Sequence, residues 1–285
     1  MRTPVRLGLF AAVLVAAGSS AYAVGTVTGT VLPQPAPAHG GVMDDGHGGA
    51  PDSEVPQGVT GLAVAEDGLV LRPERTVLTT GTQPFRFTVE DDAGTPLADY
   101  DATHERDLHL VVVRRDLTRF QHLHPERAAD GTWEVPLTLD APGPYRVYAD
   151  FAPAGRAARA LAVDVTVPGS YLPQPVAPGE RRTSTGGGYS VTVDGALAAG
   201  EQSRLSFVVR RQGADVTGDL DDYLGAKGHL VVLREGDLAY LHVHPEGEGL
   251  SFETTVPSPG RYAAFLGTSH DGVVRTADLR LETSS

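Results

Sequence analysis

Six of the ten histidines in this 285-residue chain stand in two matching groups of three. Residues 107–126 read DLHLVVVRRDLTRFQHLHPE, and residues 227–246 read KGHLVVLREGDLAYLHVHPE. The two segments are identical at nine of twenty positions with a constant offset of 120, and all three histidines are among the nine. Three neutral imidazoles within reach of one ion are typical of a site for Zn(II), Cu(II) or Ni(II). The six candidate ligands are His109, His122, His124, His229, His242 and His244.

Each segment is predicted to form a β-hairpin, and the hairpin register decides which histidines lie together. If the turn is centred after residue 116, the numbers of facing residues sum to 233, so His109 faces His124 with His122 on the same side. Facing and diagonal side chains of an antiparallel pair lie about 5 and 7 Å apart, which is within reach of one ion. In the second copy the sum is 473, which places His229 opposite His244.

The sequence leaves two interpretations of these groups open. The strands around them are rich in Val and Leu on both faces. Burial and mutual repulsion therefore favour neutral imidazole, which is the form that binds metals. Alternatively, the histidines are structural and hydrogen-bond to backbone carbonyls or to one another. Because about half of the repeated window differs between the copies while all three histidines persist, the pattern favours metal binding.

Other residues near the repeats are candidates for supporting roles. A P-G-x-Y turn follows each hairpin, and Asp150 comes after the first of these turns. His270 occupies the roughly equivalent region of the second copy, and His104 precedes the first hairpin. We count Asp150 and His270 among the candidate metal ligands and keep His104 as a further possibility. Arg114 and Arg234 are expected to pair with acidic residues near the hairpin turns.

Composition narrows the chemistry further. Cysteine is absent, which excludes disulfides, thiolate catalysis, Cys-zinc sites, iron–sulfur clusters and blue-copper centres. Only two methionines are present, so a Met-rich Cu(I) site is excluded as well. The net charge of −13 argues against nucleic acid or an anionic membrane surface as a partner. With imidazoles as the available ligands, the expected ion is Cu(II) or Zn(II).

The N-terminal residues have the pattern of an export signal. Residues 1–6 carry two arginines, residues 7–17 are almost wholly apolar, and residues 21–23 form a small-x-small cleavage site. We expect a signal peptide at residues 1–23 and a secreted or cell-surface protein. An uncleaved N-terminal anchor is the alternative. Residues 24–57 are rich in Gly, Pro and acids without a hydrophobic period, which predicts a disordered tether.

The rest of the chain predicts an all-β fold. Short β-rich runs alternate with turn signals, and no amphipathic helical period of useful length occurs. About 100 residues of such strands is the size of one immunoglobulin-like β-sandwich. We therefore expect two tandem immunoglobulin-like β-sandwich domains, at residues 58–168 and 188–285, joined by a Pro/Gly-rich linker at residues 169–187.

The H-L-V-V…H-x-H-P-E pattern resembles a group of secreted actinobacterial proteins with two tandem immunoglobulin-like modules, labelled heavy-metal-binding or YtkA-like. It occurs here as His109…His122-Leu123-His124-Pro125-Glu126 and again from His229 to Glu246. The resemblance covers the chain from about residue 61 to its end. It implies an extracytoplasmic metal-handling role, with copper as a suitable ion, and no enzyme activity.

Together these features predict an exported metal carrier, buffer or sensor that binds its ion without turnover and exchanges it with another metal-handling protein. One alternative is a metal-independent cell-surface interaction module with structural histidines. Another is a metal-dependent hydrolase or oxidase, which would need an open coordination position beside a general base. The sequence shows no such base and no nucleophile signature. Whether the two groups form separate sites or one shared site stays open.

Overall fold

The computed structural model describes residues 59–284 except Leu224, His242 and Glu248. The expected signal peptide and tether, residues 1–23 and 24–57, lie outside the described residues. Within them, nearly all regular structure is antiparallel strand, and one 3₁₀ turn, Thr217–Asp219, is the exception. The all-β prediction is confirmed. In this part of the chain no helix is long and apolar enough to cross a membrane.

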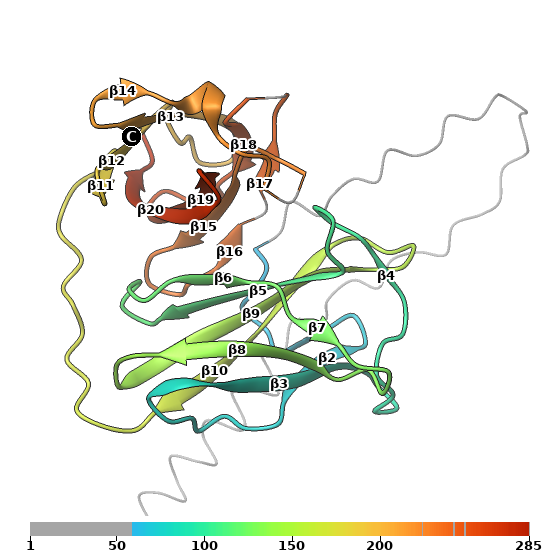
Figure 1. Cartoon of the computed structure of the whole chain (residues 1–285). Helices are drawn as coiled ribbons and strands as arrows, with labels where there is room; N and C mark the ends of the chain where they lie inside the picture. The colour runs from blue at the N-terminus through green and yellow to red at the C-terminus, as the bar shows by residue number, and fades with distance from the viewer. Residues whose placement is uncertain (1–58, 224, 242, 248, 285) are drawn as a thin grey trace, which may run out of the picture. The chain divides into compact units, whose positions relative to one another are not determined.

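The first module, β1 to β10, consists of two antiparallel sheets that face each other across a core (Figure 1). One sheet has the order β1 (Ala65–Glu66), β2 (Leu69–Pro73), β3 (Gly81–Asp91), β8 (Trp133–Leu139) and β7 (Glu126–Arg127). The other has the order β10 (Arg159–Val167), β9 (Gly143–Pro153), β5 (Leu108–Arg114) and β6 (Gln121–Leu123), with β4 (Tyr100–Asp101) paired to β9. Buried and exposed residues alternate strictly along β8, as expected for a sheet with one face on the core.

The second module, β11 to β20, repeats this plan. One sheet has the order β11 (Thr183–Gly186), β12 (Tyr189–Asp194), β13 (Gln202–Arg211), β18 (Ser251–Thr255) and β17 (Val243–Pro245), with β14 (Ala214–Asp215) on β13. The other has the order β16 (Tyr240–Leu241), β15 (His229–Arg234), β19 (Arg261–His270) and β20 (Val273–Glu282). The sequence repeat is therefore a repeat of the whole sandwich.

The second module begins earlier than the sequence indicated, because β11 lies inside the segment expected to be linker. The Gly-rich run that suggested a linker is instead the turn of a hairpin between β11 and β12. Gly187 and Gly188 have φ values of 58° and 81° in this turn. Two consecutive residues with positive φ are typical of the tight turns that match the twist of a hairpin.

The strand order identifies both modules as immunoglobulin-like. In each, the strands follow the A-B-E-D and G-F-C-C′ arrangement, with β5 and β15 as strand C. The P-G-x-Y turns form the tyrosine corners of this fold. The Tyr145 hydroxyl donates to the carbonyl oxygen of Ala141 at 2.8 Å, and the Tyr262 hydroxyl donates to that of Ser258 at 2.7 Å. The predicted tandem immunoglobulin-like sandwiches are confirmed.

Strand β5 is buried on both of its faces, which explains its almost unbroken Val and Leu content. Leu110 and Val112 point into the core of the first module. Val111 points the other way, into a separate apolar cluster in which Val231 of β15 also takes part. This intermodule cluster consists of Val111, Val113, Leu117, Tyr148, Ala160 and Ala162 from the first module and Val231, Leu233, Leu238, Tyr240, Ala263 and Phe265 from the second. The outer faces of the two G-F-C-C′ sheets therefore pack on each other.

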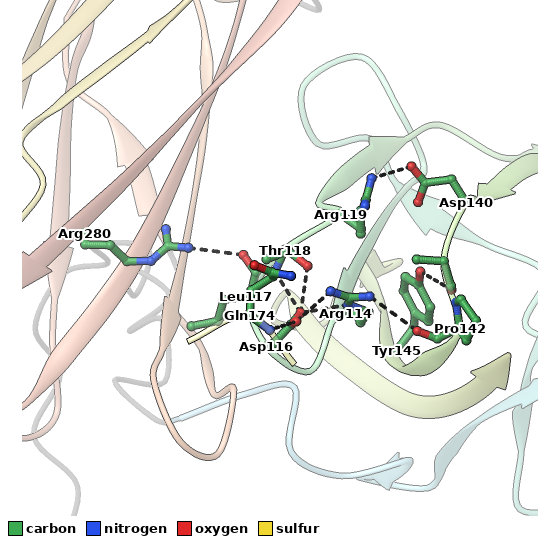
Figure 2. A network of polar contacts seen from close by, with 11 residues as sticks. Arg114, Asp116, Leu117, Thr118, Arg119, Asp140, Pro142, Tyr145, Gln174 and Arg280 are labelled. Atoms are coloured by element: carbon green, nitrogen blue, oxygen red, sulfur yellow. Dashed lines mark hydrogen bonds and ion pairs between the residues drawn. The ribbon is translucent and has the colours of Figure 1, made fainter. Parts of the chain in front are cut away.

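A buried ion pair closes the turn of the first hairpin (Figure 2). The Arg114 guanidinium contacts the Asp116 carboxylate at 2.7 Å and 3.0 Å, and the backbone N–H of Gln174 donates to the same carboxylate at 2.8 Å. Figure 2 also shows Arg280 of β20 donating to the Leu117 carbonyl oxygen at 3.2 Å. The turn is therefore tied to the segment after β10 and to the second module.

The expected arginine pairs are confirmed in both copies. In the second copy, Arg234 Nε donates to Asp237 Oδ1 at 3.0 Å. In the first copy, burial raises the pKa of Asp116, but the hydrogen bonds from Arg114, the Gln174 amide and Thr118 outweigh burial and lower it to about 2. The Asp116 carboxylate is therefore ionised at neutral pH, and its charge balances that of Arg114.

Candidate metal centre

The first hairpin has the predicted register. Leu110 pairs with Leu123 and Val111 with His122, so the numbers of paired residues sum to 233. The ladder ends at Leu123, and the chain then crosses to the opposite sheet, where β7 pairs with β8. His124 lies at this crossing, directly after β6. Because His122 and His124 are two positions apart and face β5, both imidazoles lie beside that of His109.

The three imidazoles form a nearly equilateral triangle. The distances between ring centroids are 5.2 Å for His109–His122, 5.1 Å for His109–His124 and 5.1 Å for His122–His124. Four imidazoles bound tetrahedrally, with metal–nitrogen bonds of about 2.0–2.1 Å, would have their ring centroids about 5.2 Å apart. One nitrogen from each ring lies within 4.8 Å of the others. The triangle therefore has the dimensions of three ligands around one ion.

A backbone carbonyl sets the tautomer of His109. Its Nε2 lies 2.9 Å from the carbonyl oxygen of Thr103, and since a carbonyl only accepts, Nε2 carries the hydrogen. His109 Nδ1 is then an acceptor, and it lies 3.1 Å from His122 Nε2. In metal sites a ligating histidine commonly donates its other nitrogen to a carbonyl in this way, which orients the ring.

An equivalent hydrogen bond from a histidine to a backbone carbonyl occurs in the second module. His229 Nε2 lies 2.8 Å from the carbonyl oxygen of Tyr223, which is six residues earlier, as Thr103 is for His109. Each of these carbonyls belongs to a short turn closed by a bridge, Thr103 to Arg106 in one module and Tyr223 to Ala226 in the other. Nδ1 of His229 is therefore an acceptor as well.

His122 and His124 are held in the neutral form. Burial, and after it the neighbouring histidines His109, His124, His229 and His104, lower the pKa of His122 well below its ordinary value of 6.5. Burial and the proximity of His109 and Arg106 lower the pKa of His124 to about 4. Among the described residues, His124 Nε2 is buried and has no hydrogen-bond partner. A buried polar atom without a partner costs about 1–3 kcal/mol, and a bound cation would remove this cost.

A cavity of about 160 Å³ adjoins the triangle. His109, His122, His104 and His229 line it together with Asp150. Asp150 of β9 lies directly opposite His109 of β5, so the prediction that it approaches the triangle from the next strand agrees with the structure. Its carboxylate oxygen Oδ2 accepts a hydrogen bond of 2.9 Å from the hydroxyl of Tyr240, which belongs to the second module.

The second group of histidines differs from the prediction. The β15–β16 ladder keeps the predicted sum of 473 but stops at Leu241, and β17 joins the opposite sheet. His244 pairs there with Glu253, so the predicted placement of His229 opposite His244 is wrong. His242 and the side chain of His244 lie outside the described residues. His229 instead lies beside the first group, with ring centroids 5.9 Å from His122 and 6.1 Å from His109.

His270 is not brought to these histidines. The β15–β19 register places Gly267 opposite His229, so Gly267 is the true counterpart of Asp150. His270 lies three residues further along β19, where its Nδ1 is 2.8 Å from the Tyr189 hydroxyl and it lines a different cavity of about 310 Å³. The expected equivalence of His270 with Asp150 is therefore wrong by three residues. By contrast, His104 does lie at the centre, with its ring centroid 5.0 Å from that of His229.

The sequence matches a family model over both modules, at residues 63–169 and 183–285. This chain belongs to the family described as Domain of unknown function (DUF8832). The family covers most of the chain and occurs twice in it, which agrees with the two sandwiches. A search of curated proteins finds no match.

Several solved structures of low sequence identity match the chain. The chain is 14% identical to Salmonella alpha-2-macroglobulin, with 79% of this chain and 15% of that one covered and a TM-score of 0.27. It is 15% identical to the bacterial integrin-binding protein invasin, with 78% and 41% covered and a TM-score of 0.24. For the Ig1-2 module of the Drosophila receptor protein tyrosine phosphatase DLAR, the identity is 9%, the coverage 76% and 99%, and the TM-score 0.21.

Metal-free protein should lose stability as the pH falls from 7 to 5. Burial lowers the pKa of His229 to about 4, partly offset by its bond to Tyr223, and the pKa of His124 is also about 4. Between pH 6.5 and 4 the unfolded chain therefore binds more protons than the folded one, and the free energy of unfolding falls by about 1–2 kcal/mol per histidine between pH 7 and 5. Urea unfolding at several pH values in the presence of a chelator measures this loss. The variant His124→Gln should show a shallower pH dependence, and an unchanged one would contradict the account.

Proposed function

We propose that this protein is an exported metal-binding protein that holds one Cu(II) or Zn(II) ion at His109, His122 and His124. The observation that carries the proposal is the triangle of imidazoles, whose sides match those of a tetrahedral site. The buried, unpartnered Nε2 of His124 supports it further. The protein would act as a carrier, buffer or sensor, because its ion is bound and released without turnover.

The chemistry of the ligands supports these two ions. Imidazole is a borderline ligand that suits Zn(II) and Cu(II), and affinity generally rises toward copper along the divalent series. Neutral imidazoles bind without first losing protons, so occupation of the site at pH 7 requires no displacement of hydrogen ions from His122 or His124. The cavity beside the triangle, about 160 Å³, accommodates an ion and water and leaves little room for an organic substrate. These features favour binding over catalysis.

Export is part of the same proposal. The pattern of residues 1–23 supports an extracytoplasmic location, in which the protein would receive its ion from, or pass it to, a membrane-bound or secreted metal-handling protein. The cysteine-free composition is consistent with this role, because histidine ligands do not depend on a reducing environment.

A second candidate function is a metal-independent interaction module. It is favoured by the bonds of His109 to Thr103 and His122, which satisfy both of its ring nitrogens without an ion. In this case the histidines would contribute to the packing between the modules, and stability would not depend on metal.

Calorimetric titration separates the two candidates. Residues 24–285, stripped of metal, would be titrated with Cu(II) and with Zn(II), and Mg(II) would serve as the control. We expect one equivalent to bind with submicromolar affinity, and saturation at 100 times the dissociation constant to raise the free energy of unfolding by about 2.7 kcal/mol. Binding no tighter than that of Mg(II), together with unchanged stability, would refute the metal-binding function and favour the interaction module.

A further inference from the structure

We infer that His229 of the second module supplies the fourth ligand to the ion held by the first module, so that one ion joins both modules. The inference rests on the proposed function and adds to it the identity of the fourth ligand and a consequence for the module interface. The sequence places a group of three in each module and leaves open whether the groups form separate sites or one shared site.

The position of His229 is close to that of a fourth tetrahedral ligand. Its ring centroid lies 5.9 Å from that of His122 and 6.1 Å from that of His109, against about 5.2 Å for ligands of one tetrahedral ion. Both separations exceed the tetrahedral value by less than about 1 Å. The residue is only 6% exposed, so His229 is buried beside the other imidazoles.

The packing of the modules explains why His229 reaches this place. His109 and His229 occupy equivalent positions at the start of strand C, and each lies two residues before a valine of the intermodule cluster, Val111 or Val231. Side chains two residues apart point to the same face of a strand. Both imidazoles therefore lie on the faces that pack together, at the same end of the interface.

The hydrogen bond of His229 prepares it for coordination. Because Nε2 donates to the Tyr223 carbonyl at 2.8 Å, Nδ1 carries no hydrogen and can bind a cation. His109 is prepared in the same way by Thr103. This carbonyl bond also holds the His229 ring in one orientation in the metal-free protein.

Asp150 is a competing fourth ligand, and its carboxylate already accepts a hydrogen bond. Its Oδ2 accepts a hydrogen bond of 2.9 Å from the Tyr240 hydroxyl. Tyr240 is itself buried between the modules. Coordination through that oxygen would break the hydrogen bond and leave a buried hydroxyl unpaired, at a cost of about 1–3 kcal/mol. His229 needs no such exchange, so it is favoured over Asp150 as the fourth ligand.

The test compares Zn(II) affinity and Co(II) spectra in the full residue 24–285 protein. The variant His229→Gln should bind Zn(II) more weakly, on the order of 100-fold or more, as expected for loss of a ligand. Its Co(II) complex should have a visible spectrum that differs from that of the wild type, because water takes the position left by the imidazole. The control His270→Ala removes a buried histidine outside the centre and should match the wild type. Urea unfolding without metal shows whether each variant is folded.

Amide hydrogen exchange tests whether the ion joins the two modules. In the wild type, Zn(II) should slow amide hydrogen exchange in both β5 and β15, whereas in His229→Gln it should slow exchange in β5 alone. If His229→Gln keeps wild-type affinity, spectrum and exchange, the inference is wrong while the three-histidine site stands. If Asp150→Asn weakens Zn(II) binding and changes the Co(II) spectrum while His229→Gln does neither, the carboxylate is the fourth ligand and the inference is again wrong. If the wild type binds neither ion, the proposed function itself fails.

Discussion

Replacing His122 by alanine should lower the affinity for Cu(II) and Zn(II) on the order of 100-fold or more. His122 contacts three of the other histidines. Its Nε2 lies 3.1 Å from His109 Nδ1, and its ring lies beside those of His124 and His229. Removing a group that only orients a ligand typically costs 10- to 100-fold in affinity, so loss of the ligand itself should cost at least the upper value. Calorimetric titration measures the change.

Two comparisons make this result specific. The variant His124→Ala should show a loss of affinity of the same order, because it removes another of the three imidazoles. His270→Ala should bind as the wild type does. Urea unfolding of each metal-free variant distinguishes loss of a ligand from loss of the fold. Equal binding by His122→Ala and the wild type would contradict the assignment of the triangle as the metal site.

Replacing Asp116 by alanine should lower the free energy of unfolding by about 3–5 kcal/mol. The side chains of Arg114 and Asp116 are 6% and 4% exposed, so the substitution leaves a guanidinium buried without its counter-charge. It also removes the acceptor for the Gln174 amide and the Thr118 hydroxyl. Urea unfolding at pH 7 measures the change.

A matched exposed pair provides the control. Arg119 and Asp140 are 47% and 52% exposed, and the Asp140→Ala variant should cost less than about 1 kcal/mol. The pKa of Asp116, about 2 in the folded state, lies below its ordinary value of 3.8. Its contribution is therefore complete above pH 3.8 and disappears as the pH falls toward 2. Similar losses in the two variants at pH 7 would show that the buried pair has no special role.

Local patterns in the sequence sufficed to predict the hairpin and its three histidines. The register follows from alternation and from the place of the turn, both of which lie within residues 107–126. The repeat and the turn signals likewise sufficed for two sandwiches of the observed type. These features depend on residues that are close in sequence, so periodicity and spacing are enough to find them.

The contribution of His229 to the same centre was not predicted, because it depends on how two sheets pack. Val111 and its neighbours showed that β5 is apolar on both faces, but composition does not reveal what covers the second face. The sequence does contain the information that corrects the equivalence of His270 with Asp150. The two P-G-x-Y turns are offset by 117 rather than 120, and this offset takes Asp150 to Gly267, as the strand pairing does.

Anomalous diffraction tests most directly whether the imidazole triangle holds a metal ion. Crystals of the residue 24–285 protein loaded with one equivalent of Zn(II) would be measured on both sides of the zinc absorption edge. We predict one strong anomalous peak about 2.0–2.1 Å from a ring nitrogen of each of His109, His122 and His124. No peak among these three residues, or peaks only at histidines elsewhere on the protein, would contradict the account.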